Sequence, residues 1–177
     1  MTDLTMKSLA LLLVVSTAVL AKPETRIVGG SEAQPGEAPF VVSIQDRDGQ
    51  HFCAGTIISQ NAILASAPCL EGQRLNAGRV IAGTLDISGT GGGTIHRARS
   101  ITIHPNYTLD GGKSIHDIAI ATGDSGGPLY VAPQVGGNGV VWGLVSWGFS
   151  CASDVHPGVY TEVSKYRDWI DQVLATS

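Results

Sequence analysis

A serine flanked by glycines is the strongest candidate for chemistry in this chain. Residues 123–128 read GDSGGP, a run that can bend tightly around Ser125. Such a bend would present the backbone N–H groups of Gly123 and Ser125 together, which is the geometry that holds a developing oxyanion. We therefore interpret Ser125 as a candidate nucleophile and Gly123 with Ser125 as a candidate oxyanion hole. The alternative is a Gly-rich turn without chemistry.

Five further motifs accompany this segment in a fixed order. They are RIVGG at 26–30, CAG at 53–55, DIA at 117–119, SWG at 146–148 and PGVYT at 157–161. Together with GDSGGP they resemble the secreted trypsin- and chymotrypsin-like serine peptidases, and the resemblance covers residues 26–177. It implies an all-β fold, a chymotrypsin-like double antiparallel β-barrel with a C-terminal helix. It also implies serine-type endopeptidase activity, which is proteolysis by acyl transfer to Ser125 and then to water, with no metal or organic cofactor.

The resemblance assigns further roles residue by residue. Asp117 matches the buried aspartate that orients the general-base imidazole, although a turn residue at a strand end is the alternative for so short a motif. Ser146, Trp147 and Gly148 match the strand that binds an extended substrate. Gly148 and Gly158 match the small residues that keep the specificity pocket open.

A zymogen is implied as well. Cleavage after Arg26 would release the ammonium group of Ile27, which in the family folds inward and pairs with the carboxylate that is Asp124 here. Cys53 and Cys69 match the disulfide that brackets the catalytic histidine.

The catalytic histidine itself is absent. The family pattern places it just before the second of these cysteines, where this chain has Pro68. Proline cannot accept the Ser125 proton, and a neutral serine is a poor nucleophile without a base. We interpret the five histidines present as ordinary polar or surface residues, and we expect His116 to point away from its neighbour Asp117 because side chains alternate along a strand. The protein is therefore expected to be catalytically impaired or inactive.

A long internal segment is also absent. Ala121 is followed directly by Thr122, and the chain falls roughly 50 to 100 residues short of a double-barrel domain. We expect the second barrel to be truncated at this join. The expected partner of Cys151 is then missing, so Cys151 is left unpaired. Ala119 stands where a trypsin-like enzyme has the Asp that binds basic substrates, so the substrate specificity is not assigned.

The N-terminus predicts export. Lys7, an apolar centre over 9–15 and a small-x-small site ending at Ala21 are typical of a signal peptide. A membrane anchor is the alternative, but roughly 12 apolar residues are fewer than the about 20 that a span requires. The predicted domains are a signal peptide at 1–21, an activation propeptide at 22–26 and a peptidase domain at 27–177. Asn106 begins an N-glycosylation acceptor pattern, so we expect it in a surface loop.

Short β-rich runs separated by turn residues must position these groups. The predicted strands are Phe40–Gln45, Thr56–Ile58, Ala62–Ser66, Arg79–Ala82, Ile95–His104, Ile118–Ala121, Leu129–Val131, Val140–Trp147 and Gly158–Val163. One helix is expected at the end, where Val163, Tyr166, Ile170, Val173 and Leu174 share a face.

The composition limits the classes of molecule that the protein is expected to bind. A net charge of −4 with 15% charged residues and no basic run argues against nucleic acid. We expect secretion, no membrane attachment after signal cleavage, and protein or peptide substrates or inhibitors as partners.

Three hypotheses about function follow from the sequence as a whole. They are a working endopeptidase, a non-catalytic homologue that binds proteins, and a shortened isoform or imperfect gene reconstruction of an active serine peptidase.

Overall fold

The computed structural model describes residues 31–74, 78–123, 140–147 and 158–177. Contacts divide the chain into residues 1–32 and residues 33–177, and every element below belongs to the second unit. The predicted signal peptide and activation propeptide lie outside the described residues.

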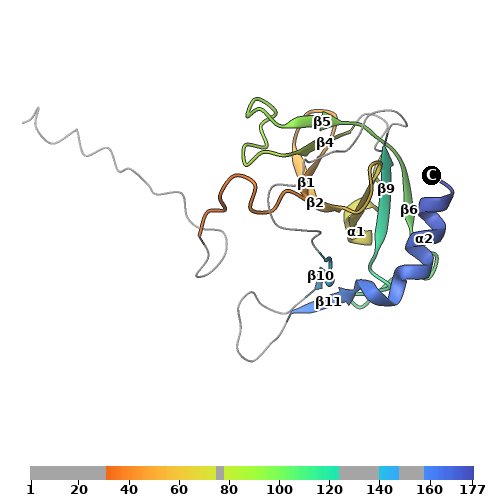
Figure 1. The fold of residues 1–177 in the computed structure, drawn as a ribbon. Coiled ribbons are helices and arrows are strands. Elements are labelled where there is room, and N and C mark those ends of the chain that lie inside the picture. The colour runs from red at the N-terminus through yellow and green to blue at the C-terminus, as the bar shows by residue number, and fades with distance from the viewer. Residues whose placement is uncertain (1–30, 75–77, 124–139, 148–157) are drawn as a thin grey trace, which may run out of the picture. The chain divides into compact units, whose positions relative to one another are not determined.

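Seven antiparallel strands form the main sheet (Figure 1). They are β1 (Val41–Gln45), β2 (His51–Ile57), β3 (Ala62–Ala65), β4 (Arg79–Ala82), β5 (Thr94–His96), β6 (Ala98–Ile103) and β9 (Ala119–Gly123). Their order across the sheet is β5-β4-β1-β2-β3-β9-β6.

This order makes the sheet curl. β5 and β6 lie at opposite ends of the order, yet Arg97 alone separates them in the chain. One nearly continuous stretch therefore pairs with β4 at one end and with β9 at the other. The two edges can approach only if the sheet bends round on itself, which is how antiparallel sheets become barrels.

The sheet is buried on both faces at β3 and β9. Strand β9 shows this directly, because Ala119 and Ala121 join one apolar cluster while Ile120 joins another. The first cluster also contains the small and branched residues Val42, Ile44, Ile63, Ala65, Leu70 and Val80. The second contains Ala62, Leu64, Ile118, Val163, Ile170 and Val173. Buried apolar area of this kind is the main driving force for the fold.

The C-terminal helix covers the second cluster. A 3-10 turn, η2 (Val163–Tyr166), leads into α2 (Arg167–Ala175). Ile170 and Val173 are buried against the sheet, as the periodicity predicts, and Val163 is buried at the start of η2.

Three smaller elements complete the described chain. A hairpin joins β7 (Thr108–Asp110) to β8 (Lys113–Ile115), a two-stranded sheet joins β10 (Gly143–Trp147) to β11 (Val159–Glu162), and α1 (Ala67–Leu70) is a single helical turn. The fold is all-β, with one curled sheet, a reduced second sheet and a C-terminal helix. This arrangement confirms the predicted class, a chymotrypsin-like fold whose second barrel is truncated.

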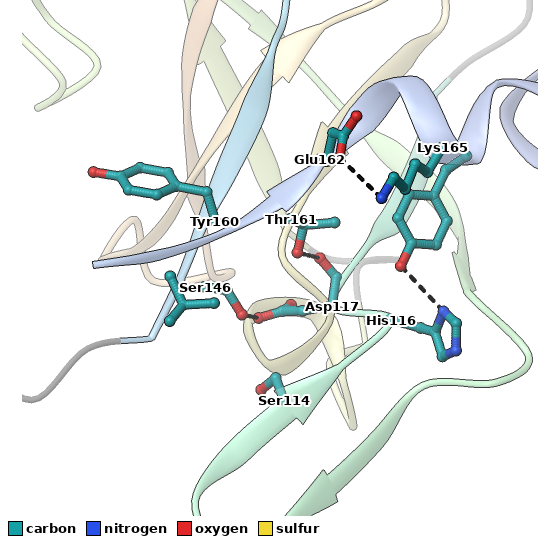
Figure 2. A pocket seen from close by; sticks show the side chains of 10 residues that line it. Ser114, His116, Asp117, Ser146, Tyr160, Thr161, Glu162 and Lys165 are labelled. Atoms are coloured by element: carbon teal, nitrogen blue, oxygen red, sulfur yellow. Dashed lines mark hydrogen bonds and ion pairs between the residues drawn. The ribbon is translucent and has the colours of Figure 1, made fainter. Parts of the chain in front are cut away.

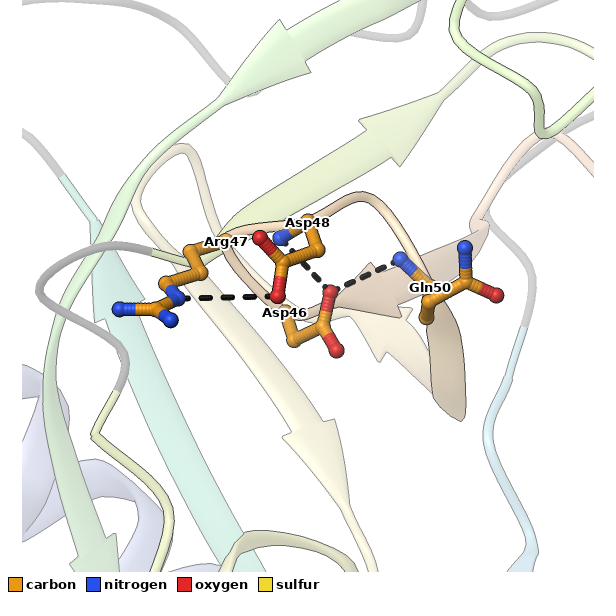
Figure 3. Close-up of polar contacts among 4 residues, drawn as sticks. All are labelled: Asp46, Arg47, Asp48 and Gln50. Carbon is orange, nitrogen blue, oxygen red and sulfur yellow. Dashed lines mark hydrogen bonds and ion pairs between the residues drawn. The ribbon is translucent and has the colours of Figure 1, made fainter.

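The turn between β1 and β2 shows how local chemistry sets the strand pairing. The Oδ1 atom of Asp46 accepts hydrogen bonds from the backbone N–H groups of Asp48, at 2.9 Å, and Gln50, at 2.8 Å (Figure 3). Gly49 takes a φ of 83°, which favours glycine. These features fix the turn that aligns β1 with β2.

Candidate functional site

A tight turn presents Asp117. Strand β8 ends at Ile115, and β9 begins at Ala119. Between them, the N–H of Ile118 donates to the carbonyl of His116 at 2.8 Å, which closes a three-residue turn centred on Asp117. His116 has a φ of 51°, in the left-handed region. His116 therefore lies in a turn rather than in a strand.

The side chain of Asp117 is 1% exposed and is held from two directions (Figure 2). Oδ1 accepts the backbone N–H of Ala67 at 2.7 Å, and Oδ2 accepts a hydrogen bond from the hydroxyl of Ser146. The hydroxyl of Thr161 donates to the Asp117 carbonyl at 2.8 Å. Since buried carboxylates require such donors, three separate segments fix this residue in one place.

Pro68 occupies the first turn of α1, next to the residue that donates to Asp117. Proline is tolerated there because N–H groups of the first helical turn have no partner within the helix. The predicted disulfide is confirmed: Cys53 and Cys69 are bonded with their Cα atoms 5.9 Å apart, and it ties β2 to α1.

A cavity of about 280 Å³ opens beside Asp117. Its lining is mostly polar and comes from β8, the turn at Asp117, β10, β11 and η2: Ser114, His116, Asp117, Ser146, Val159, Tyr160, Thr161, Glu162, Lys165 and Tyr166. Nζ of Lys165 lies 3.2 Å from Oε2 of Glu162. The Ser164 hydroxyl and then Lys165 hold the pKa of the Glu162 carboxyl below its usual range.

His116 lines this cavity, and His104 packs beside His116. The rings of His104 and His116 stack with centroids 5.0 Å apart, and His104 also contacts the ring of Trp169. Nδ1 of His116 lies 3.1 Å from the hydroxyl of Tyr166. Burial, followed by the charge of His116, lowers the pKa of His104, and burial raises the pKa of Tyr166. Figure 2 shows that His116 points away from the contact between Asp117 and Ser146.

Strand β10 carries two of the predicted substrate-binding residues. Ser146 is close to Asp117, while Trp147, at the end of the strand, lies under the ammonium group of Lys113, 5.6 Å from the ring centroid. Gly158 is exposed just before β11. Gly148 lies outside the described residues.

The predicted oxyanion segment is described only at its start. Gly123 ends β9, and its N–H donates to the carbonyl of Asn61 at 2.8 Å. An oxyanion role for Gly123 would require its N–H to leave the carbonyl of Asn61 and bind the oxyanion instead.

Several predicted site residues lie outside the described part of the chain: Arg26, Ile27, Asp124, Ser125 and Cys151. The predicted strand at 129–131 lies outside it too. Asn106 is exposed after β6, and its glycosylation stays a prediction.

Sequence reasoning missed two groups that hold Asp117. The backbone N–H of Ala67 carries no signal in its residue type, and Thr161 is distant in sequence. The hairpin of β7 and β8 was also missed, although Asp110, which ends β7, and the Gly111-Gly112 pair that follows it form a turn signal.

The fold and the site define a class of protein: antiparallel barrels in which a buried aspartate lies between a disulfide-tied helical turn and an edge strand. The trypsin family model matches residues 27–121 and 111–170, so the chain belongs to the trypsin family.

Curated relatives agree with this assignment. Trypsin theta of Drosophila erecta is 25% identical over 88% of this chain and 89% of its own length. Trypsin, alkaline C of Manduca sexta is 27% identical over 92% of this chain and 97% of its own length. Transmembrane protease serine 9 of Rattus norvegicus is 27% identical over 86% of this chain, which spans only 22% of that protein.

No helix among the described residues has the length and apolar character to cross a membrane. Within the same residues, no three His, Cys, Asp or Glu side chains gather as a metal site would require.

Proposed function

We propose that this trypsin-family protein is secreted and binds protein or peptide segments in the family's substrate cleft without hydrolysing them efficiently. One observation carries the proposal. Asp117 is buried and held by Ala67 and Ser146, but the next residue after Ala67 is Pro68. In this proposal Asp117 is the group that would orient a general base, and Pro68, at the proposed position of the base, has no ionisable side chain.

The expected loss of catalysis is large. Ser125 is the proposed nucleophile, and a serine hydroxyl needs an adjacent base to react at neutral pH. In subtilisin, removing the histidine alone costs about a million-fold in turnover. The proposed oxyanion groups, Gly123 and Ser125, would leave only residual catalysis.

Binding does not need the base. Strand β10 pairs with β11 at one of its edges, and β10 is the edge proposed to receive an extended peptide. The proposed contacts are the backbone of Ser146, the ring of Trp147 and the open space at Gly148 and Gly158. Activation by cleavage after Arg26, with pairing of Ile27 and Asp124, belongs to the same proposal.

Active-site labelling tests this function. The secreted protein, cleaved after Arg26, would be treated with a serine-reactive phosphonate and assayed with small ester substrates, with Pro68→His as the variant and Pro68→Ala as its matched control. We expect no labelling of Ser125 and no turnover in the original protein or in Pro68→Ala. Labelling of Ser125 in the original protein at the rate of an ordinary trypsin would overturn the proposal.

A second candidate is a shortened form of an active serine peptidase. The relatives favour it, because the alignment to trypsin theta runs over 241 positions and so exceeds the 177 residues of this chain. Sequencing the full-length transcript across codon 68 and the join of Ala121 to Thr122 decides between the two. A histidine codon with an inserted segment would favour the active parent, and confirmation of both departures would favour the binding protein.

A further inference from the structure

We propose that the cavity beside Asp117 binds a small organic cation with N–H donors, a guanidinium above all. The inference goes beyond the proposed function, because it concerns a ligand at the cavity and requires neither a reactive Ser125 nor a peptide along β10. Figure 2 shows the groups that surround the space, with Ser146 and Tyr160 on one side of Asp117 and His116 on the other.

The charge of the lining selects a cation. Asp117 and Glu162 are the two carboxylates of the cavity, and Lys165 is its one ammonium group. Lys165 is paired with Glu162, so this pair is neutral overall. Asp117 is 1% exposed, and none of the ion pairs among the described residues includes it. A buried charge without an opposite charge is costly, so a cation beside Asp117 is favoured and an anion is excluded.

The carboxylate also retains capacity to accept hydrogen bonds. An ionised carboxylate offers about four acceptor positions. Within the described chain, the N–H of Ala67 and the hydroxyl of Ser146 fill two of them. Pro68 follows Ala67 and has no N–H to add. A ligand with several N–H groups matches this capacity better than a bare ion does.

The remaining lining suits an organic group rather than a metal. Tyr160 and Tyr166 are among the residues that line the cavity, and aromatic rings attract guanidinium and ammonium groups. The hydroxyls of Ser114 and Thr161 add neutral acceptors. A metal ion would need a cluster of ligating side chains, and the described residues contain no such group.

Methylguanidinium chloride is a suitable probe, and N-methylurea is its neutral counterpart of nearly the same shape. Each would be added to the 15N-labelled secreted protein at constant ionic strength, and the amide signals of Ser146, Thr161 and Ala67 would be followed by NMR. We expect saturable shifts with methylguanidinium and none with N-methylurea. Equal effects of the two probes, or no saturable shift with methylguanidinium, would overturn the proposal.

Variants of residues that line the cavity test whether methylguanidinium binds there. Asp117→Asn is expected to weaken the binding of methylguanidinium by about tenfold or more, because it removes the buried charge. Since Asp117 is buried, Asn can also disturb the fold there, so Ser114→Leu serves as a second test that narrows the cavity and keeps the carboxylate. Ser114→Leu is expected to weaken the binding of methylguanidinium by the same factor. Asp110→Asn, on exposed β7, is the matched control and should bind unchanged. Undiminished binding by Ser114→Leu and by a folded Asp117→Asn would place the cation elsewhere and refute the assignment.

Discussion

Ala67 and Asp117 are fifty positions apart in the sequence and are joined by a hydrogen bond of 2.7 Å from a backbone N–H to a carboxylate oxygen. The bond connects the helical turn tied by the Cys53–Cys69 disulfide to the turn that begins β9. Ser146 holds the second carboxylate oxygen from β10. The carboxylate therefore links the curled sheet to the reduced second sheet.

The first prediction concerns Ser146. Ser146→Ala should destabilise the protein by roughly 1 to 3 kcal/mol, because a buried carboxylate oxygen loses a donor. The measurement is urea unfolding followed by circular dichroism. Ser164→Ala is the matched control, since its hydroxyl bonds an exposed carboxylate, and it should change stability by about 0.5 kcal/mol or less. Equal effects of the two variants would contradict the role given to the Asp117 contact.

The second prediction concerns the disulfide. Cys53 and Cys69 are separated by 16 positions, and opening a loop of this size should cost about 3 kcal/mol of stability. Urea midpoints would be compared with and without a reducing agent. The double variant Cys53→Ala with Cys69→Ala should be less stable than the oxidised protein and insensitive to the reductant. A midpoint that does not move when the bond is reduced would show that the loop is already constrained by other contacts.

The third prediction is a pH dependence from His104. Its pKa is lowered in the folded protein, so the unfolded chain binds the proton more readily. The contribution to stability is therefore full above the unfolded value of about 6.5 and is lost as pH falls from there through the lower folded pKa. Unfolding free energies between about pH 5 and 7.5 measure it.

A variant pair isolates this effect. His104→Phe keeps an aromatic ring against Trp169 but removes the titration, so the decline of stability on acidification should become shallower. His96→Asn, in which a ring bonded to Thr94 is replaced, is the control and should keep the original decline. An unchanged profile in His104→Phe would assign the pH dependence to other groups.

The fourth prediction separates two contacts in one turn. Asp46→Ala removes the acceptor of two backbone N–H groups and should cost about 1 kcal/mol. Arg47→Ala should cost almost nothing, because Arg47 pairs with Asp48 at the surface, where ion pairs contribute little. Thermal unfolding of the two variants makes the comparison, and a larger loss from Arg47→Ala would reverse the ranking.

Much of the fold could be predicted because local patterns determined it. The predicted strand at Arg79–Ala82 is confirmed with identical bounds, and α2 buries the predicted face. The single predicted run from Ile95 to His104 is in fact two strands, interrupted at Arg97, because the stretch changes partners there. Residue periodicity does not show a change of partner.

The site was predicted less completely, for a physical reason. Asp117 and Ser146 were recognised through motifs, but the N–H of Ala67 has no side chain to indicate its role. Ser146 was assigned to substrate binding, which stays a prediction, and its hydroxyl donates to Asp117, which was not expected. His116 was expected to face away from Asp117 through strand alternation, and it does so in a turn with a positive φ instead. Contacts formed by distant backbone groups are not visible in spacing.

The pairing of β3 with β9 has a kinetic consequence. Ala62 lies opposite Thr122 in this pair, so three further strands of the curled sheet, β4, β5 and β6, lie in the loop that the pair closes. Contacts so distant in sequence make β-rich domains fold slowly, on the order of milliseconds to seconds. During synthesis from the N-terminus, β3 must wait with an unpaired edge until β9 has emerged. This interval is the stage at which the nascent chain is most vulnerable to pairing with another molecule.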